Sequence, residues 1–164
     1  MKAHHIRLAR EKDLPAINDI YNYVVRTSTA TFQVEPDSLA DRRRWFRSRS
    51  KSEPVIVLYV ADDLVAWGTL TFHRTREGYR QTGETSVYVW RDCYRRGYGR
   101  AILADLIARA RTLKYHTLLA GCCSEARPSI ALHKNLGFRK VACFREVGRK
   151  FDRWLDVIYL QLLL

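Results

Sequence analysis

The stretch ETSVYVWRDCYRRGYGRAIL, residues 84–103, joins two runs of different hydrophobic period through a basic loop with two glycines. Residues 84–91 are rich in Val, Tyr, Thr and Trp, which favour a strand. After the loop, apolar residues recur at helical spacing and predict a helix from about residue 100 to residue 113. A strand followed by such a helix carries the chain across a sheet. The stretch therefore predicts an α/β crossover whose loop lies at the helix N-terminus.

Strand and helix patterns continue on both sides of this crossover. The expected strands are residues 4–9, 54–61, 64–72, 117–121, 138–146 and 154–163. One helix is expected to follow Asp13 as N-cap and a second to follow Ser38, while a helix over residues 129–135 ends at Gly137. Residues 27–34 suit a loop or an irregular extended segment. This order predicts a mixed α/β sheet with an antiparallel meander and one crossover.

Length and composition favour a single domain over residues 1–164. A chain of this length with 47% apolar residues can bury a core, and no linker, repeat or low-complexity segment divides it. No stretch approaches the roughly 20 apolar residues that span a bilayer, so we expect no membrane partner. The start, MKAHHIRLAR, lacks the apolar region of a signal peptide. We therefore expect a cytoplasmic protein.

The net charge of +12, from 29 Lys+Arg and 17 Asp+Glu, has two explanations. One is nucleic-acid binding; the other is an anionic small ligand on a generally basic surface. The arginines are spread along the chain instead of massed in one tail, which favours the second explanation. The charge alone does not decide between them.

The four cysteines, Cys93, Cys122, Cys123 and Cys143, form no C-x-x-C pair. They also show no metal-ligand spacing with the five histidines. We expect reduced, mostly buried thiols and no metal ion.

The glycine loop matches only one of three phosphate-binding patterns. The dinucleotide fingerprint G-x-G-x-x-G fails at Ile102, and no G-K-[ST] of a P-loop occurs. The segment from Arg96 to Ala101 matches R-x-x-G-x-A. Small residues, free N–H groups and the helix dipole would favour a pyrophosphate there, and Arg95, Arg96 and Arg100 would neutralise it. The alternative is a basic turn that merely connects a strand to a helix.

Six segments carry a wider resemblance: DLPAINDIYNYVV, STATF, RTREGYRQTGETSVYV, RRGYGRAIL, SIALHKNLGF and VGRKFDRWLDVIYLQ. Together, over residues 6–161, the sequence resembles the GNAT superfamily of acetyl-CoA-dependent N-acetyltransferases. Within it, the sequence is similar to the phosphinothricin/methionine sulfoximine N-acetyltransferase branch. The resemblance implies the GNAT fold, a mixed, mostly antiparallel, seven-stranded twisted sheet with about four helices.

The resemblance also implies where acetyl-CoA binds. The pyrophosphate would lie on the loop, with contacts from Arg95, Arg96, Gly97, Tyr98, Gly99, Arg100 and Ala101. The pantetheine would follow residues 86–90, where the sheet splays. Main-chain groups of Val87, Tyr88 and Val89 would contact it, and an N–H near Val89 would polarise the thioester carbonyl.

Glu84 matches the family's catalytic glutamate, and we expect it to be the general base that deprotonates the acceptor amine. Without the resemblance, a solvated carboxylate at the strand edge would be the simpler interpretation. His133 and Tyr88 are lower-ranked candidates for a catalytic or substrate-binding role. A lone helical histidine more often packs or hydrogen-bonds, and an aromatic strand residue is usually core.

The acceptor is expected to be a small amino-acid-like molecule whose carboxylate needs cations. Arg74, Arg76 and Tyr79 match the family's substrate loop, and Arg80 is a weaker candidate; the alternative is a solvated basic loop. Phe32 in STATF matches an aromatic wall, for which ordinary packing is the alternative, and Ser86 also belongs to the expected substrate site.

The C-terminal segment matches the family's dimer-forming region and implies a homodimer. It includes Lys150, Phe151, Arg153, Trp154 and Asp156. The alternative for this segment is a satisfied ion pair beside a core tryptophan.

Three positions depart from the family pattern. Ala126 replaces an asparagine that contacts the cofactor, Gly83 replaces a common valine beside Glu84, and Asp152 replaces the glycine of KFGRW. The first departure would weaken coenzyme A binding, and the second would loosen the placement of Glu84.

Four functions compete. The leading one is acetyl transfer to the α-amino group of a small amino-acid analogue such as phosphinothricin, methionine sulfoximine or methionine sulfone. A second keeps the fold but uses a peptide N-terminus or a polyamine, although Arg74 and Arg76 argue against a polyamine. A nucleic-acid binder lacks any supporting motif. A non-catalytic acyl-CoA sensor is opposed by Glu84 and weakly favoured by Ala126.

Overall fold

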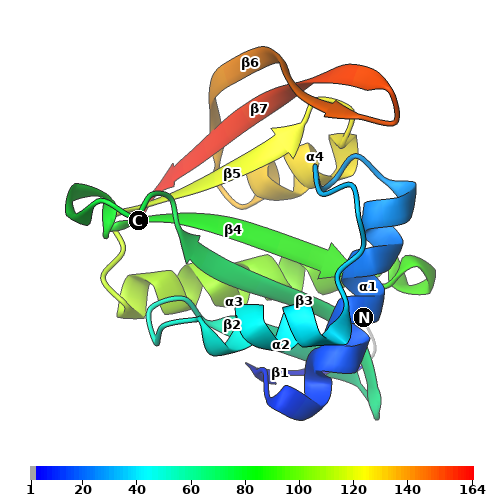
Figure 1. Ribbon diagram of the computed structural model, residues 1–164. Coiled ribbons are helices and arrows are strands. Elements are labelled where there is room, and N and C mark those ends of the chain that lie inside the picture. The colour runs from blue at the N-terminus through cyan, green and yellow to red at the C-terminus, as the bar shows by residue number, and fades with distance from the viewer. Residues whose placement is uncertain (1–2) are drawn as a thin grey trace.

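The predicted crossover forms the centre of the sheet. The computed structural model describes residues 3–164 (Figure 1). Strand β4 (Thr82–Val89) leads into helix α3 (Tyr98–Thr112), which returns the chain to β5 (Thr117–Cys123), parallel to β4. The helix begins two residues earlier than predicted, because Gly97 takes a left-handed φ of 85° and serves as its N-cap.

The remaining elements follow the predicted order, with ends that differ by a few residues and three short 3₁₀ turns in addition. They are β1 (His5–Leu8), η1 (Glu11–Asp13), α1 (Leu14–Thr27), α2 (Leu39–Arg47), β2 (Val55–Val60), β3 (Asp63–Phe72), η2 (Glu77–Tyr79), η3 (Arg91–Cys93), α4 (Arg127–Asn135), β6 (Arg139–Lys150) and β7 (Arg153–Leu163). The strand order is β1-β2-β3-β4-β5-β7-β6. Every neighbouring pair is antiparallel except β4 and β5.

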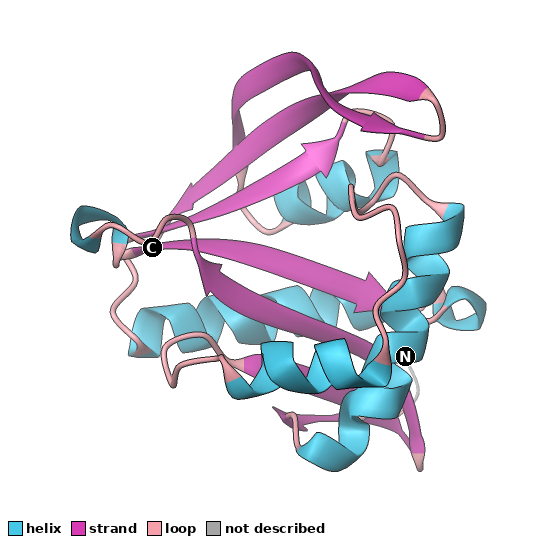
Figure 2. Ribbon diagram, in the orientation of Figure 1, coloured by secondary structure: helices cyan, strands magenta, loops and turns pink. Residues whose placement is uncertain are grey.

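Helices cover both faces of the sheet (Figure 2). On one face, α3 buries Ile102, Leu103 and Leu106 in the larger of two apolar clusters. On the other, α1 packs Ile17 against Trp67 of β3. Alternating strand residues therefore divide between two cores, which explains why β2 is apolar throughout and β3 largely so.

Strands β4 and β5 separate after three paired positions. Their register joins Thr82 to Thr117, Gly83 to Leu118 and Glu84 to Leu119, whereas β4 stays paired with β3 as far as Val89. Figure 1 shows the two strands diverging from this point. The second half of β4 thus has main-chain groups that no strand satisfies on one side.

Two of the three predicted helix signals act as expected. Ser38 accepts a hydrogen bond from Asp41 N in a capping box, and Gly137 follows α4 with a φ of 93°. Asp13 precedes α1, but its side chain does not cap the helix. Its carboxylate instead accepts hydrogen bonds from Arg7 (2.6 Å), the Arg10 N–H (2.7 Å) and the Tyr59 hydroxyl (2.8 Å). The predicted capping role of Asp13 is therefore wrong.

Replacing Asp13 with Asn is expected to lower the free energy of unfolding by about 2–4 kcal/mol, because a buried network loses its negative charge and one of its two acceptor oxygens. Burial opposes ionisation, but the bonds from Arg7, Arg10 and Tyr59 outweigh it and lower the pKa of Asp13 from 3.8 to about 2. Since the folded pKa is the lower one, this stabilisation is complete above about pH 4 and is lost as the pH falls towards 2.

Urea unfolding of the Asp13→Asn variant from pH 7 to pH 2.5 checks this prediction. The exposed Asp19→Asn variant of the same helix is the matched control, and it should unfold like the wild type. A constant difference between Asp13→Asn and wild type at all pH values would contradict the ionic role.

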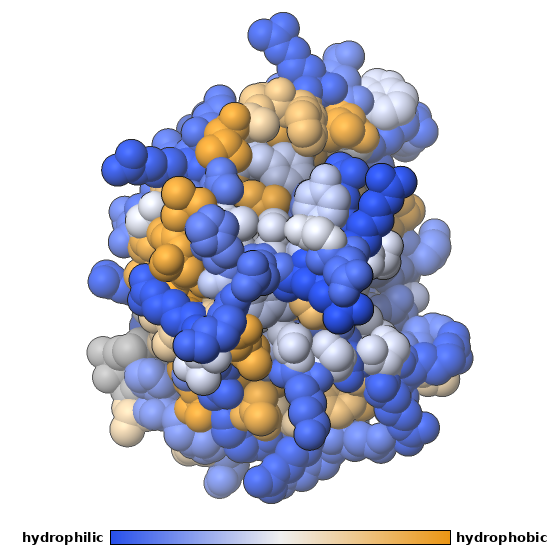
Figure 3. Space-filling view, turned by 90° about the vertical axis from the view of Figure 1, so that its left-hand side faces the viewer, coloured by the Kyte–Doolittle hydropathy of each residue, from blue (hydrophilic) through white to orange (hydrophobic). Residues whose placement is uncertain are grey.

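No helix of the described residues is long and apolar enough to cross a membrane. All four cysteines are free; Cys122 and Cys123 are buried, Cys93 is half-buried and Cys143 is exposed. Hydrophilic side chains cover much of the face seen in Figure 3, and hydrophobic residues form separate patches, one of them near the top, at the height where Figure 1 places β6 and β7.

Candidate active site

Glu84 occupies the last paired position before β4 and β5 separate. Strand alternation places its side chain on the same face as those of Ser86 and Tyr88, towards α1 and α2. The side chain is 33% exposed, and its Oε1 is hydrogen-bonded to Nδ1 of His73. A partly exposed carboxylate with one fixed oxygen can accept a proton from a bound molecule.

Beyond Glu84, one edge of β4 is no longer covered by β5, and only every second residue of β4 directs its main-chain groups to that edge. The carbonyl of Thr82 accepts from His73 N, and Trp90 N donates to Val65 O, so the even-numbered residues face β3. Val87 and Val89 therefore direct their N–H and C=O groups away from β3. Tyr88 directs its main chain to β3, which corrects its predicted place among the main-chain contacts.

The glycine loop presents free donors at the start of α3. Arg95 has a φ of 61° and Gly97 a φ of 85°, and the first helical bond runs from Ala101 N to Gly97 O at 3.1 Å. The N–H groups of the first turn thus have no helical acceptor. Arg95, Arg96 and Arg100 are exposed and form no ion pair with any residue from 3 to 164. Helix dipole, donors and charge together fit a pyrophosphate.

Tyr98 contributes to this loop through its main chain only. Its side chain is 2% exposed and lies in the α3 cluster, with an edge contact to the ring of His4. A Cβ on Gly99 would lie 3.5 Å from side-chain carbons of Leu132 and Val89, an ordinary contact distance. Packing alone would therefore admit an alanine there, and the glycine leaves the main chain open to the close approach of a ligand.

The loop after β3 brings some predicted acceptor residues to Glu84. The guanidinium of Arg74 lies 5.5 Å from the ring centre of Tyr79, and that ring lies 5.9 Å from the imidazole of His73. Arg76 and Arg80 are exposed and make no ion pair within the described chain. The structure thus joins Arg74 and Tyr79 to the Glu84 group but not Arg76 or Arg80.

Tyr159 of β7 belongs to the same group, although the sequence did not single it out. Its ring lies about 3.5 Å from where a Cβ on Gly121 would be, and it contacts Phe144 with ring centres 5.2 Å apart. Burial raises the pKa of Tyr159, as does the charge of Glu84, while Arg74 opposes this rise. No sequence signal distinguished this tyrosine from other aromatic strand residues; the missing side chain at Gly121 makes room for it.

Phe32 packs against the β6–β7 hairpin. A Cβ on Gly148 would collide with the ring of Phe32, so the ring lies directly on the main chain. Nearby, Lys150 is 3% exposed and donates to the carbonyls of Ser28 and Thr31 at 2.7 Å each. These bonds fasten the segment between α1 and α2 to β6, the edge strand of the sheet, and Phe32 lies in that segment.

His133 lies on the opposite face from Glu84. It is 3% exposed, its Nδ1 donates to Ser129 O at 2.8 Å, and its Nε2 lies 3.2 Å from the Thr85 hydroxyl. Burial lowers its pKa, so the neutral form with both nitrogens engaged is favoured. This geometry supports the hydrogen-bonding interpretation of His133.

The side chain of Tyr88 packs in the second core, stacked on Trp67 at 4.7 Å. Burial raises its pKa strongly, and the neighbouring Tyr21 adds to this effect, so the phenol stays protonated. A phenol with a raised pKa is a weak proton donor, which favours packing over acid catalysis.

The structure shows the surroundings of two departures from the family pattern, Gly83 and Ala126. Gly83 is buried, and a Cβ there would lie 3.0 Å from both Leu118 Cδ2 and Tyr115 Cε1. Tyr115 thus fills the space that a valine side chain would take, and Gly83 stays paired with both β3 and β5. Ala126 is the N-cap of α4 and offers no side-chain cap.

Replacing Gly83 with Val is expected to destabilise the fold by about 1–3 kcal/mol through overpacking against Tyr115 and Leu118. In a Tyr115→Leu background the same change should cost clearly less, because the ring that it meets is gone. Thermal or urea unfolding of the four proteins in this cycle measures the coupling. Equal costs in both backgrounds would contradict the exchange of volume between the two positions.

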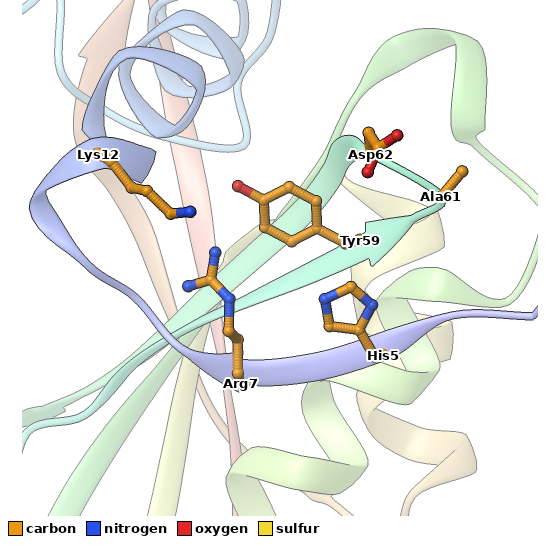
Figure 4. Close-up of a pocket in the computed structure, with 6 residues that line it drawn as sticks. All are labelled: His5, Arg7, Lys12, Tyr59, Ala61 and Asp62. Carbon is orange, nitrogen blue, oxygen red and sulfur yellow. The ribbon is translucent and has the colours of Figure 1, made fainter.

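Two hollows of the surface lie away from Glu84. One of about 350 Å³ lies beside β1 and β2, with Arg7, Lys12 and Tyr59 around it (Figure 4). A second, of about 540 Å³, lies between α1 and the β2–β3 turn and includes Trp90 and Cys93. In the first, Arg7 is already paired with Asp13. Neither hollow contains Glu84 or the glycine loop, and no three His, Cys, Asp or Glu side chains among residues 3–164 gather as a metal site.

Comparison with known proteins agrees with this arrangement. A family model for the acetyltransferase (GNAT) domain matches residues 6–159. The L-methionine sulfoximine/L-methionine sulfone acetyltransferase of Pseudomonas aeruginosa is 39% identical over 159 residues, covering 96% of this chain and 92% of that protein.

Two solved structures share the fold over nearly the whole chain. A ribosomal-protein-alanine N-acetyltransferase from Brucella melitensis has a TM-score of 0.95 at 38% identity, covering 98% of this chain and 99% of its own. The protein yncA from Salmonella typhimurium, solved with its cofactor acetyl-CoA, has a TM-score of 0.95 at 35% identity, covering 99% and 95%. The chain therefore belongs to the GNAT family of acetyltransferases.

Proposed function

We propose that this protein transfers an acetyl group from acetyl-CoA to the α-amino group of a small amino-acid analogue, with Glu84 as the general base. The position of Glu84 carries the proposal: it stands where β4 leaves β5, with its carboxylate partly exposed. The strand that begins there leads directly to a cationic loop at a helix N-terminus.

The donor would extend along β4 between these two ends. The loop residues Arg95, Arg96 and Arg100, with the first N–H groups of α3, would hold the pyrophosphate. From Glu84 to Val89 the strand spans about 17 Å, at about 3.3 Å per residue. Over that length Val87 and Val89 offer main-chain groups to an extended arm, as an added strand would use them. When bound, acetyl-CoA supplies the activated acetyl group as a thioester.

Glu84 would remove a proton from the acceptor. An α-ammonium has an unperturbed pKa of about 8, so near neutral pH most of the acceptor is protonated and cannot attack the thioester. A carboxylate beside it, directly or through a water, accepts that proton. The sequence predicted an N–H near Val89 for polarising the thioester carbonyl; we propose the N–H of Val87 for this role, because it lies nearer to Glu84.

The acceptor would bind on the α1/α2 side of β4. Arg74 is placed to form a bidentate pair with its carboxylate. Tyr79 and Tyr159 offer aromatic surface around that position, and Phe32, packed on Gly148, would supply the aromatic wall that the family resemblance implies. The P. aeruginosa relative, named for methionine sulfoximine and methionine sulfone, supports an acceptor of this size. The B. melitensis neighbour, named for ribosomal-protein alanine, favours a peptide N-terminus as the second candidate.

Thiol release from acetyl-CoA, followed with a colorimetric reagent over an acceptor panel, tests the proposal. The panel contains phosphinothricin, methionine sulfoximine, methionine sulfone, spermidine and a peptide that begins with alanine. We expect turnover on the amino-acid analogues. Turnover on the peptide alone would replace the acceptor, whereas no turnover with intact acetyl-CoA binding would favour a sensor.

We also propose that the protein forms a homodimer through β6 and β7. These strands and their turn expose large hydrophobic side chains: Val141 (54%), Phe144 (50%), Val147 (56%), Phe151 (49%), Trp154 (61%) and Leu163 (66%). Large exposed apolar side chains concentrated on two neighbouring strands are typical of interaction surfaces. Trp154 is not a core residue, so that part of the alternative for this segment is wrong, although Arg153 does pair with Glu125 at 2.8 Å. Lys150 is buried within its own chain and cannot contribute to the interface.

The Trp154→Glu variant is expected to raise the dissociation constant of the dimer at least tenfold, because an aromatic side chain that the proposed interface would bury is replaced by a charged one. Sedimentation velocity over a concentration series gives the dissociation constant. Val34→Glu, another exposed apolar position, is the control and should leave the constant unchanged. A wild type that stays monomeric at high micromolar concentration would refute the dimer.

A further inference from the structure

The residue that follows β3 touches the proposed base. His73 N donates to Thr82 O at 3.0 Å, which extends the β3–β4 ladder by one position and fixes the main chain of His73. Because residues paired across strands share a face, the imidazole lies on the same face as Glu84, diagonally beside it. Its Nδ1 is hydrogen-bonded to Glu84 Oε1.

The imidazole is also held from its other side. Tyr79 of η2 meets it edge to face, with ring centres 5.9 Å apart and planes at 67°. The His73 side chain is only 19% exposed. The charged and titratable groups around the pair are Arg74 and Tyr79 on the loop and Tyr159 on β7. The β3–β4 ladder and Tyr79 of η2 therefore define where the imidazole lies, and through it where Oε1 of Glu84 lies.

Oε1 of Glu84 thus accepts a hydrogen bond from within the protein, whereas Oε2 is available to a bound molecule. Oε2 has no hydrogen bond to any residue from 3 to 164, while the side chain keeps 33% exposure. A glutamate has three side-chain torsions, and the last one is broad and roughly two-fold. A hydrogen bond to one oxygen removes most of that freedom.

We infer that His73 is a positioning residue that fixes Glu84 so that Oε2 faces the acceptor amine. This inference rests on the proposed function of Glu84 as the base. The imidazole donates its Nδ1–H to Oε1, and the proton of the acceptor ammonium passes to Oε2. Misplacing a reacting group by about 1 Å can cost about 10²-fold in rate. The role of His73 should therefore appear in kcat more than in KM.

Two substitutions of His73 separate positioning from packing. His73→Phe keeps a ring against Tyr79 but has no donor, and we expect kcat to fall about 10- to 100-fold. His73→Asn offers an amide N–H near the position of Nδ1, and it should recover kcat to within about threefold of wild type. KM values for acetyl-CoA and for the acceptor should change less than about threefold in both. His116→Phe, at an exposed position outside the group, is the matched control and should behave as wild type.

A spectroscopic measurement tests the hydrogen bond without turnover. In the protein without acetyl-CoA, proton NMR should show a downfield resonance from an imidazole N–H. This resonance should disappear in His73→Asn, and in Glu84→Ala it should shift or be lost through exchange of the proton with water. Its insensitivity to Glu84→Ala would overturn the contact.

The kinetic outcomes separate the two proposals. An active wild type with an unimpaired His73→Phe variant, or with His73→Asn as impaired as His73→Phe, would overturn the positioning role and leave the transferase intact. A wild type that acetylates no acceptor would overturn the proposed function itself, and the role of His73 with it.

Discussion

Glu84→Gln is expected to lower kcat with the best amino-acid acceptor by about 10²- to 10⁴-fold at pH 7, the usual contribution of a positioned base. Glutamine has nearly the same shape, and its amide oxygen can still accept the bond from His73, so the fold and the His73 contact should persist. Acetyl-CoA binding, measured by calorimetry, should be unchanged, because the predicted donor contacts lie farther along β4 and in the loop.

The loss should shrink as the pH rises. Below about pH 8 the acceptor amine is mostly protonated and depends on a base, whereas above it the solvent supplies the neutral amine. The ratio of wild-type to variant kcat/KM should therefore fall between pH 7 and pH 9.5. Glu77→Gln, in the exposed η2 turn, is the control for a lost carboxylate near the site. If Glu84→Gln keeps more than about a third of the wild-type rate at pH 7, Glu84 is not the base.

The sequence was sufficient to predict those features of the fold that depend on residues close together along the chain. The crossover, the start of α2 and the end of α4 depend on periodicity and on single caps such as Ser38 and Gly137, and all are confirmed. The loop donors were predictable for the same reason, because a helix N-terminus is a local feature. Asp13 shows the limit: its carboxylate bonds to Arg7 and to Tyr59, 46 residues away, instead of capping the helix beside it.

The parts of the site that depend on distant strands were not visible in the sequence. Tyr159 reaches the Glu84 group because β7 pairs with β5 and because Gly121 leaves room on β5. His73 lies beside Glu84 through the β3–β4 register, eleven residues apart in sequence. Lys150 contacts two carbonyls about 120 residues earlier. A pattern of residue types carries no information on such registers until the sheet order is known.

Removing two arginines of the glycine loop, as Arg96→Ser with Arg100→Ser, is expected to reduce kcat/KM for acetyl-CoA by about 10²-fold, or about tenfold for each lost charge-assisted contact. Most of the change should appear in KM, because the loop lies at the far end of β4 from Glu84. Both side chains are exposed and outside every ion pair of the described residues, so the fold should not depend on them. Increasing salt should narrow the difference, since screening weakens the wild-type contacts.

An acetyl donor that lacks phosphate groups gives the decisive control. Acetylpantetheine keeps the thioester and the arm that would follow β4, but it has no pyrophosphate for the loop to bind. Wild type and double variant should therefore use acetylpantetheine with nearly equal kcat/KM, both far below wild type with acetyl-CoA. Arg43→Ser with Arg44→Ser, on the exposed side of α2, removes the same charge elsewhere and should leave both donors unaffected. If the loop variant loses activity equally with both donors, the arginines act on the fold or on β4, and the pyrophosphate site is somewhere else.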